Sequence, residues 1–354
     1  MGFIRKFFAG SNSSEGFYSL FKDVITNDAK RVYLLKGGPG TGKSYFMRSI
    51  EQELVKDGHD REQFYCSSDA DSLDAISFPR LGIALIDATA PHAIEPQWPG
   101  CRDEIIYLGN FWSSQDLYAK REQIMQGGLA KQKHFANAFR YFKAAKCIED
   151  TMSGDAQRIF WDNGDLDRVH SAIKGQVIAE PKRGKIRTLF ASALTPQGHI
   201  SHIRTLIKGY SELFVLQGLS GSGKSAEIKR IANHTQIMGL DAELFLYPLN
   251  PQKVLHLLIP QLKIAILTAT VLDPLDDLPG ACRILMGPTS NEPSNARSVT
   301  LFNELLGLGM ESLRQAQSGH AEIEEIYMQQ MDFKGLDKYK DEILAEINFY
   351  KNLS

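Results

Sequence analysis

Two glycine-rich segments of this chain end in Lys-Ser and have the spacing of loops that bind phosphate. They are residues 37–44, GGPGTGKS, and residues 218–225, GLSGSGKS. Glycines let several backbone N–H groups point at one phosphate, the lysine adds a positive charge, and the serine hydroxyl is a ligand for Mg²⁺. Both segments, called here the first and second glycine loops, therefore predict binding of a nucleoside triphosphate with Mg²⁺.

The residues expected to contact a nucleotide belong to each loop or directly follow it. In the first copy they are Gly38, Pro39, Gly40, Thr41, Gly42, Lys43, Ser44 and Tyr45, and in the second Ser220, Gly221, Ser222, Gly223, Lys224, Ser225 and Ala226. Ser44 and Ser225 are the hydroxyls expected at the metal.

Acidic side chains that could complete a metal site follow the first loop along the chain. Asp87 ends the apolar run 83–86, and a carboxylate at the end of a neighbouring strand commonly orders the Mg²⁺ shell. We expect Lys43 to bind phosphate and Asp87 to hold the metal. Asp69, in a polar segment, is expected to position water or a second substrate.

The sequence around each loop predicts the elements that position these residues. An apolar run at 32–36 predicts a strand before the first loop, and 43–57 has helical spacing. Further strands are predicted at 3–9, 63–66, 83–86, 105–108, 187–191, 213–217, 243–247 and 263–267, and helices at 16–27, 199–209 and 224–238. Such alternation predicts an α/β fold, with a mostly parallel sheet flanked by helices and ligands at the carboxyl ends of its strands.

The two loops are part of a longer internal repeat. Lys43 and Lys224 are 181 positions apart, and the same shift aligns residues 81–89 with 262–270. A duplicated domain explains this pattern. We therefore expect two tandem domains, residues 1–181 with a helical insertion at about 113–175, and residues 182–354 with a helical extension at about 298–354.

The position of the repeat's opening strands suggests an exchange between the halves. The strand near Arg187 opens the second repeat yet follows the helices of the first, while the second half ends in helices. We expect the halves to exchange these strands, so that residues 3–9 complete the second sheet.

The two copies differ in their acidic residues. Thr268 occupies the position that aligns with Asp87, and the segment 69–74 loses its three aspartates in the second copy, where Asn250, Gln252 and Leu255 stand in place of Asp69, Asp71 and Asp74. Asp71 and Asp74 also suit a turn or helix start. We expect chemistry at the first site and a regulatory or structural role for the second.

Loop residues after the third strand of each half leave further roles open. Asp273 and Asp276 could supply the second copy with a carboxylate, and His92, at the position matching Asp273, suits either a solvated loop or a phosphate contact. Arg102 and Arg283 match each other and could serve the surface or reach the other site.

Composition indicates a globular, cytoplasmic protein. Apolar residues make up 43% of the 354, and the formal charge of −2 makes a nucleic-acid partner unlikely. The four cysteines form no CxxC motif, which favours reduced thiols. No apolar run is long enough for a membrane span, so no membrane association is expected.

Together the two loops, Asp87 and the segment 66–74 resemble the P-loop NTPase superfamily. The tandem layout, with DATAPH at 87–92 and MDF at 331–333, is similar to a little-characterised bacterial family described as ATPases or ATP-binding proteins. The resemblance implies binding of ATP or GTP with Mg²⁺ and identifies no acceptor substrate.

Three activities fit these residues. The first is ATP hydrolysis at the first loop with a degenerate second loop. The second is phosphoryl transfer to a nucleotide or small molecule, with the helical segment as a lid and Asp69 or Asp71 as base. The third is a non-catalytic switch whose nucleotide state changes the angle between the halves for a protein partner.

Overall fold

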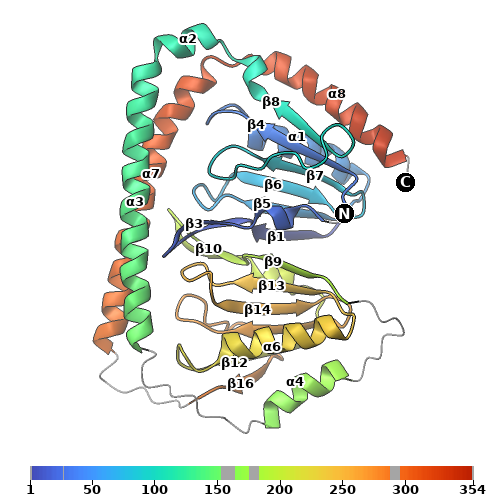
Figure 1. The fold of residues 1–354 in the computed structure, drawn as a ribbon, viewed down its shortest axis with the longest axis vertical. Helices are drawn as coiled ribbons and strands as arrows, with labels where there is room; N and C mark the ends of the chain where they lie inside the picture. Colours follow the sequence, from blue (N-terminus) through green and yellow to red (C-terminus); the bar gives the residue numbers. More distant parts are fainter. Residues whose placement is uncertain (1, 27, 153–163, 175–182, 288–295, 353–354) are drawn as a thin grey trace.

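The computed structural model describes residues 2–26, 28–152, 164–174, 183–287 and 296–352, and its strands form two large sheets with the same topology. In spatial order the first sheet comprises β1 (Ile4–Phe8), β5 (Arg61–Tyr65), β6 (Leu73–Phe78), β7 (Ile83–Asp87), β4 (Arg31–Lys36) and β8 (Asp103–Tyr107). The second comprises β9 (Ile186–Leu189), β13 (Ala242–Leu246), β14 (Val254–Ile259), β15 (Ile264–Thr268), β12 (Glu212–Gln217) and β16 (Cys282–Leu285). Only β6 and β14 run antiparallel to their neighbours within these described sheets. The expected α/β class is confirmed, with mixed, mostly parallel sheets (Figure 1).

The predicted strand exchange is wrong. β1 pairs in parallel with β5 and β9 with β13, so each opening strand completes the sheet of its own repeat. The sheets meet edge to edge instead, where Phe8 and Phe190 exchange backbone hydrogen bonds of 3.0 and 3.1 Å. The prediction failed because helices, not strands, cross between the halves.

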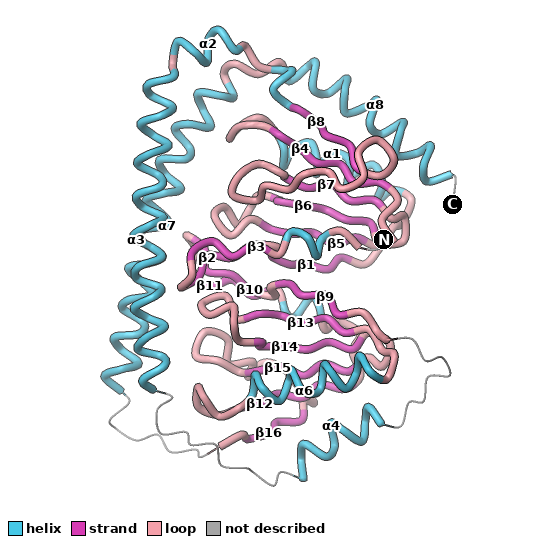
Figure 2. Tube along the Cα trace, in the orientation of Figure 1, coloured by secondary structure: helices cyan, strands magenta, loops and turns pink. Residues whose placement is uncertain are grey.

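Two long helices carry this crossing. α3 (Arg121–Met152) and α7 (Ala296–Met328) lie side by side along both sheets (Figures 1 and 2). They are antiparallel, because Gly127 lies against Ile323 while Gly309 lies against Phe142. Their antiparallel course brings the end of each helix to the sheet of the other repeat.

The helices that follow the long pair also pack across. α8 (Phe333–Asn352), from the end of the chain, adds Leu336, Ile343 and Ile347 to the core between the first sheet and α1 (Lys43–Lys56). α4 (Gly164–Lys174) adds Val169 and Ile173 to the core between the second sheet and α6 (Lys224–Ile237). Helices are present in both regions for which the sequence predicted them. The last helix of each region, α4 or α8, packs on the half to which it does not belong in sequence.

Two predicted helices are mostly hairpins. Residues 16–27 include β3 (Gly16–Ser19), paired with β2 (Gly10–Ser13), and the short 3₁₀ turn η1 (Phe21–Val24). Residues 199–209 include β11 (Gly198–Ser201), paired with β10 (Ser192–Thr195), and the one-turn α5 (Ile203–Leu206). The turns place Gly16 and Gly198 at φ of 97° and 121°, which glycine adopts readily. The apolar residues at helical spacing, among them Phe21, Val24, Ile203 and Leu206, belong instead to one core shared with strands of both sheets.

The remaining helices lie near the predicted positions. η2 (Leu108–Phe111) and α2 (Ser114–Ala119) precede α3. The predicted boundary at 181–182 and residues 153–163 of the predicted helical insertion lie outside the described residues. No helix in the described part of the chain is long and apolar enough to cross a membrane.

The contact between the halves follows an approximate twofold symmetry. Arg5 donates to Glu243 at 2.7 Å, and Arg187, the matching residue, donates to Glu62 at 2.8 and 2.9 Å. Burial opposes ionisation of Glu62, yet Arg187 and then Arg5 keep its pKa below the usual value. Reciprocal contacts of this kind characterise an isologous dimer interface, here within one chain.

We expect Glu62→Gln to destabilise the protein by about 3–5 kcal/mol, because it leaves two largely buried arginines, Arg5 and Arg187, with only Glu243 as a counter-charge. Urea unfolding measures this loss. Glu53→Gln is the matched control: its carboxylate pairs with Lys56 on the exposed face of α1, and its removal should cost less than about 1 kcal/mol. Equal effects of both variants would contradict a stabilising role for the buried pairs.

Candidate functional site

Both glycine loops have left-handed glycines at the same two positions. The first joins β4 to α1 and the second joins β12 to α6. Gly40 and Gly42 have φ of 68° and 84°, and the matching Gly221 and Gly223 have 85° and 91°. Left-handed residues at these matching positions turn successive N–H groups toward one side of the loop, where an anion can be bound.

The first loop brings together the residues predicted for phosphate and metal binding. The Lys43 ammonium donates to the carbonyls of Gly37 and Gly38 at 3.0 and 2.7 Å and lies 3.7 Å from Asp87 Oδ2. Asp87 ends β7, directly beside β4 in the sheet. Ser44 Oγ accepts the backbone N–H of Leu73 at 3.0 Å. The side chains of Lys43, Ser44 and Asp87 all line one cavity.

Two further side chains complete a group that could hold a divalent cation. Asp74, Asp87 and His92 each offer a ligand atom, and these atoms lie within 4.8 Å of one another. Burial raises the pKa of Asp74 to about 6, although His92 opposes this rise. The ring of His92 stacks on Phe21 at 4.6 Å, which fixes its orientation. Asp74, left open by the sequence, belongs here because it lies on β6, a strand that local patterning did not reveal.

The other aspartates of the polar segment have different positions. Asp69 lines the cavity and accepts the hydroxyl of Ser72 at 2.5 Å. Asp71 is exposed, lies outside the cavity lining, and offers its backbone carbonyl to Arg48. The lining of the cavity therefore includes Asp69 and does not include Asp71.

Side chains from the crossing helices line the far side of this cavity, which has a volume of 1130 Å³. Lys131 Nζ lies 2.8 Å from His320 Nδ1. Burial lowers the pKa of Lys131 and, helped by Lys131, lowers that of His320 to about 4. The last turns of α7 touch the loop itself, with Glu324 against Gly40 and Tyr327 against Gly38. No local sequence signal identified these residues, because their role depends on how the helices cross.

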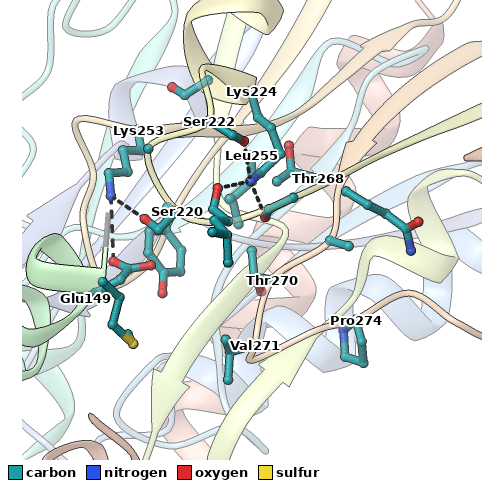
Figure 3. A pocket seen from close by; sticks show the side chains of 18 of the residues that line it. Glu149, Ser220, Ser222, Lys224, Lys253, Leu255, Thr268, Thr270, Val271 and Pro274 are labelled. Atoms are coloured by element: carbon teal, nitrogen blue, oxygen red, sulfur yellow. Dashed lines mark hydrogen bonds and ion pairs between the residues drawn. The ribbon is translucent and has the colours of Figure 1, made fainter. Parts of the chain in front are cut away.

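The second loop faces a cavity of 910 Å³ (Figure 3). Lys224 donates to the carbonyls of Gly218 and Leu219 at 2.6 and 2.7 Å, and Ser225 Oγ accepts the backbone N–H of Val254 at 2.8 Å. These contacts repeat those of the first loop. Burial, followed by the charge of Lys253, lowers the pKa of Lys224 to about 8.

The second site has no carboxylate in the place of Asp87, where Thr268 ends β15. Asp273 does not replace it, because Arg204 binds this side chain at 3.0 Å and it lies outside the cavity lining. Asp276 lines the cavity, but its side chain is 76% exposed and faces Arg283 at 3.7 Å. Within the described residues, no group comparable to Asp74, Asp87 and His92 lies at this loop.

Arg102 and Arg283, which match each other in the repeat, each contact residues of their own half. Arg102 pairs with Asp103, and Arg283 donates to the carbonyl of Leu275 at 2.9 Å. Neither lines the cavity of the opposite half, so the structural role is the one that the contacts favour.

Comparisons with family models, characterised proteins and solved structures gave no match for this chain. The assignment of chemistry to either cavity therefore depends on the residues and their geometry.

We expect Gly40→Ala to loosen the end of α7 from the first loop. A Cβ at this position would meet the backbone of Glu324, which adds about 1–3 kcal/mol of overpacking to the strain of a left-handed alanine. Gly16→Ala provides the control, because φ is 97° there and the Cβ would meet open space. Urea unfolding should show the larger loss for Gly40→Ala; equal losses would mean that the helix contact contributes nothing.

Proposed function

We propose that this protein is a nucleotide-dependent enzyme of the P-loop NTPase type, which binds ATP or GTP with Mg²⁺ at the first glycine loop and hydrolyses it. One observation carries this proposal: Lys43, Ser44 and Asp87 meet at a concave glycine loop that precedes α1. A helix N-terminus with inward-facing N–H groups favours phosphate. A carboxylate and a hydroxyl beside it suit Mg²⁺, a hard cation that prefers oxygen ligands.

Each residue has a role that follows from its position. Lys43 would bind the terminal phosphates, while Ser44 and Asp87, with Asp74 nearby, would hold the Mg²⁺. The metal, when bound, would neutralise charge on the phosphate oxygens. Asp69 faces the cavity on a polar segment, where it would position the attacking water. The second loop would bind a phosphate-bearing ligand in a regulatory role.

Phosphoryl transfer to a small molecule is the second candidate. Lys131, His320 and Gln317 face the same cavity as the first loop, and Gln317 Nε2 lies 3.5 Å from Asp69 Oδ1. These polar groups come from the crossing helices and could contact an acceptor near Asp69. A kinase would release ADP only when the acceptor is present, whereas a hydrolase would release it with water alone.

We expect Lys43→Ala to lower nucleotide turnover by about 100-fold or more, because it removes a cation that stabilises charge on the transferring phosphate. Lys224→Ala should retain measurable turnover, since the second loop lacks the metal-binding carboxylates. Steady-state phosphate release measures both. Equal losses would show that the two loops act as one catalytic unit.

The role of the metal has a separate test. Asp87→Asn keeps the size of the side chain and removes its charge, so it should weaken Mg²⁺-dependent nucleotide binding by about tenfold or more. Calorimetric titration with and without Mg²⁺ measures this change. Tight Mg²⁺-nucleotide binding by the unmodified protein with no turnover would favour the switch over either enzyme.

A further inference from the structure

We propose that the second cavity binds its phosphate-bearing ligand without a divalent cation, whereas the first requires one. This inference rests on the proposed binding of phosphate by both glycine loops. The new element is that the ligand of the second site carries no divalent cation. The two sites would then respond to different forms of nucleotide in the same solution.

The charges that line the cavities differ. Two lysines, Lys43 and Lys131, face the first cavity together with five carboxylates: Asp69, Asp74, Asp87, Glu324 and Asp337. Two lysines, Lys224 and Lys253, face the second together with two carboxylates, Glu149 and Asp276. A polyphosphate entering the first cavity therefore meets excess negative charge unless a cation accompanies it, whereas the second presents balanced charges.

The carboxylates of the second cavity are engaged by basic side chains. Glu149 Oε2 lies 3.7 Å from Lys253 Nζ, and Asp276 lies 3.7 Å from Arg283. In Figure 3, Glu149 lies on the Lys253 side of the cavity. The second site keeps the serine hydroxyl expected at a metal, that of Ser225. At the end of β15, however, Thr268 stands where the first site has Asp87.

Lys253 places a positive charge beside the second loop at a position where the first half has no lysine. The matching residue in the first half is Ser72. Lys253 Nζ lies 3.3 Å from Ser220 Oγ on the loop. Lys224, the lysine of the loop and the first residue of α6, donates from Nζ to Ser222 Oγ at 3.1 Å. Two amines therefore flank one phosphate-binding loop, and they can neutralise phosphate oxygens in place of a metal.

A buried hydroxyl provides an independent sign of a ligand. Thr268 is 3% exposed, lines the cavity, and its Oγ1 has no hydrogen-bond partner within the described residues. Leaving a buried hydroxyl unpaired costs about 1–3 kcal/mol. A phosphate oxygen near Lys224 would accept this O–H, a role that an aspartate at the same position could not perform.

The rest of the cavity indicates a nucleotide-sized ligand with an apolar part. Met152, Tyr247, Val271, Pro274 and Phe302 give its lining an apolar part. A volume of 910 Å³ falls within the range of about 300–1,000 Å³ typical of small-molecule sites. An aromatic base against this apolar wall, with its phosphates on the loop, fits the distribution of polar groups.

The decisive experiment separates the sites by mutation and removes the metal. Calorimetric titrations use the β,γ-imido analogues of ATP and GTP, and inorganic pyrophosphate, in Mg²⁺ or in EDTA. Lys43→Ala leaves the second loop intact, and Lys224→Ala leaves the first. Lys43→Met repeats the first test with a side chain of similar length, and Lys56→Ala, an exposed lysine of α1, controls for loss of charge.

Lys43→Ala should bind an analogue with a Kd that changes by less than about threefold between Mg²⁺ and EDTA. Lys224→Ala should bind it in Mg²⁺ and lose about 30-fold or more in EDTA, equivalent to about 2 kcal/mol. If Lys43→Ala and Lys43→Met bind none of the probes in EDTA, the inference is wrong. If Lys224→Ala fails to bind in Mg²⁺, the proposed function of the first site fails separately.

Discussion

The contact of α7 with the first glycine loop constrains how the two halves of this chain can move. Glu324 and Tyr327 lie against Gly40 and Gly38, so the backbone expected to hold phosphate is packed against a helix from the other repeat. The same helix lines the second cavity through Phe302, while α3 lines the second through Glu149 and the first through Lys131. A ligand that shifts the first loop must therefore displace a helix that also lines the second cavity. This is the physical element through which two sites can be coupled.

The duplicated halves preserved their interface while their sites diverged. Arg5 and Arg187 make reciprocal pairs with Glu243 and Glu62, and Phe8 pairs with Phe190 at the meeting edge of the sheets. An isologous surface constrains both members of each contact, because a change in one half loses its partner in the other. A ligand site has no such reciprocal partner. The replacement of Asp87 by Thr268 could therefore occur in one half without disturbing the contact between them.

Sequence reasoning predicted the parts of the fold that depend on local pattern. The loops, the strands before them and the helices after them appear where glycine spacing and apolar runs placed them. It missed β6 and β14. The polar residues before Leu73 read as a loop, which hid β6, and an alternating parallel series of strands and helices leaves no place for the two antiparallel strands. It also predicted helices where Gly16 and Gly198 make hairpin turns. Lys131 and His320 could not be found locally, since only the crossing of α3 and α7 brings them to the first loop.

The charge of each cavity links these features to its chemistry. A glycine loop and a lysine are common to both sites, so phosphate binding alone cannot distinguish them. In the proposal the distinction comes from the neighbouring residues: the buried Asp74 and the partly buried Asp87 would impose a need for counter-charge at the first loop, whereas Lys253 would reduce that need at the second. Under this proposal, metal dependence would be set by the strands and helices around the loop rather than by the loop itself. Because α3 and α7 line both cavities, the proposed metal-dependent event at one site and the proposed metal-independent ligand at the other would act on the same pair of helices.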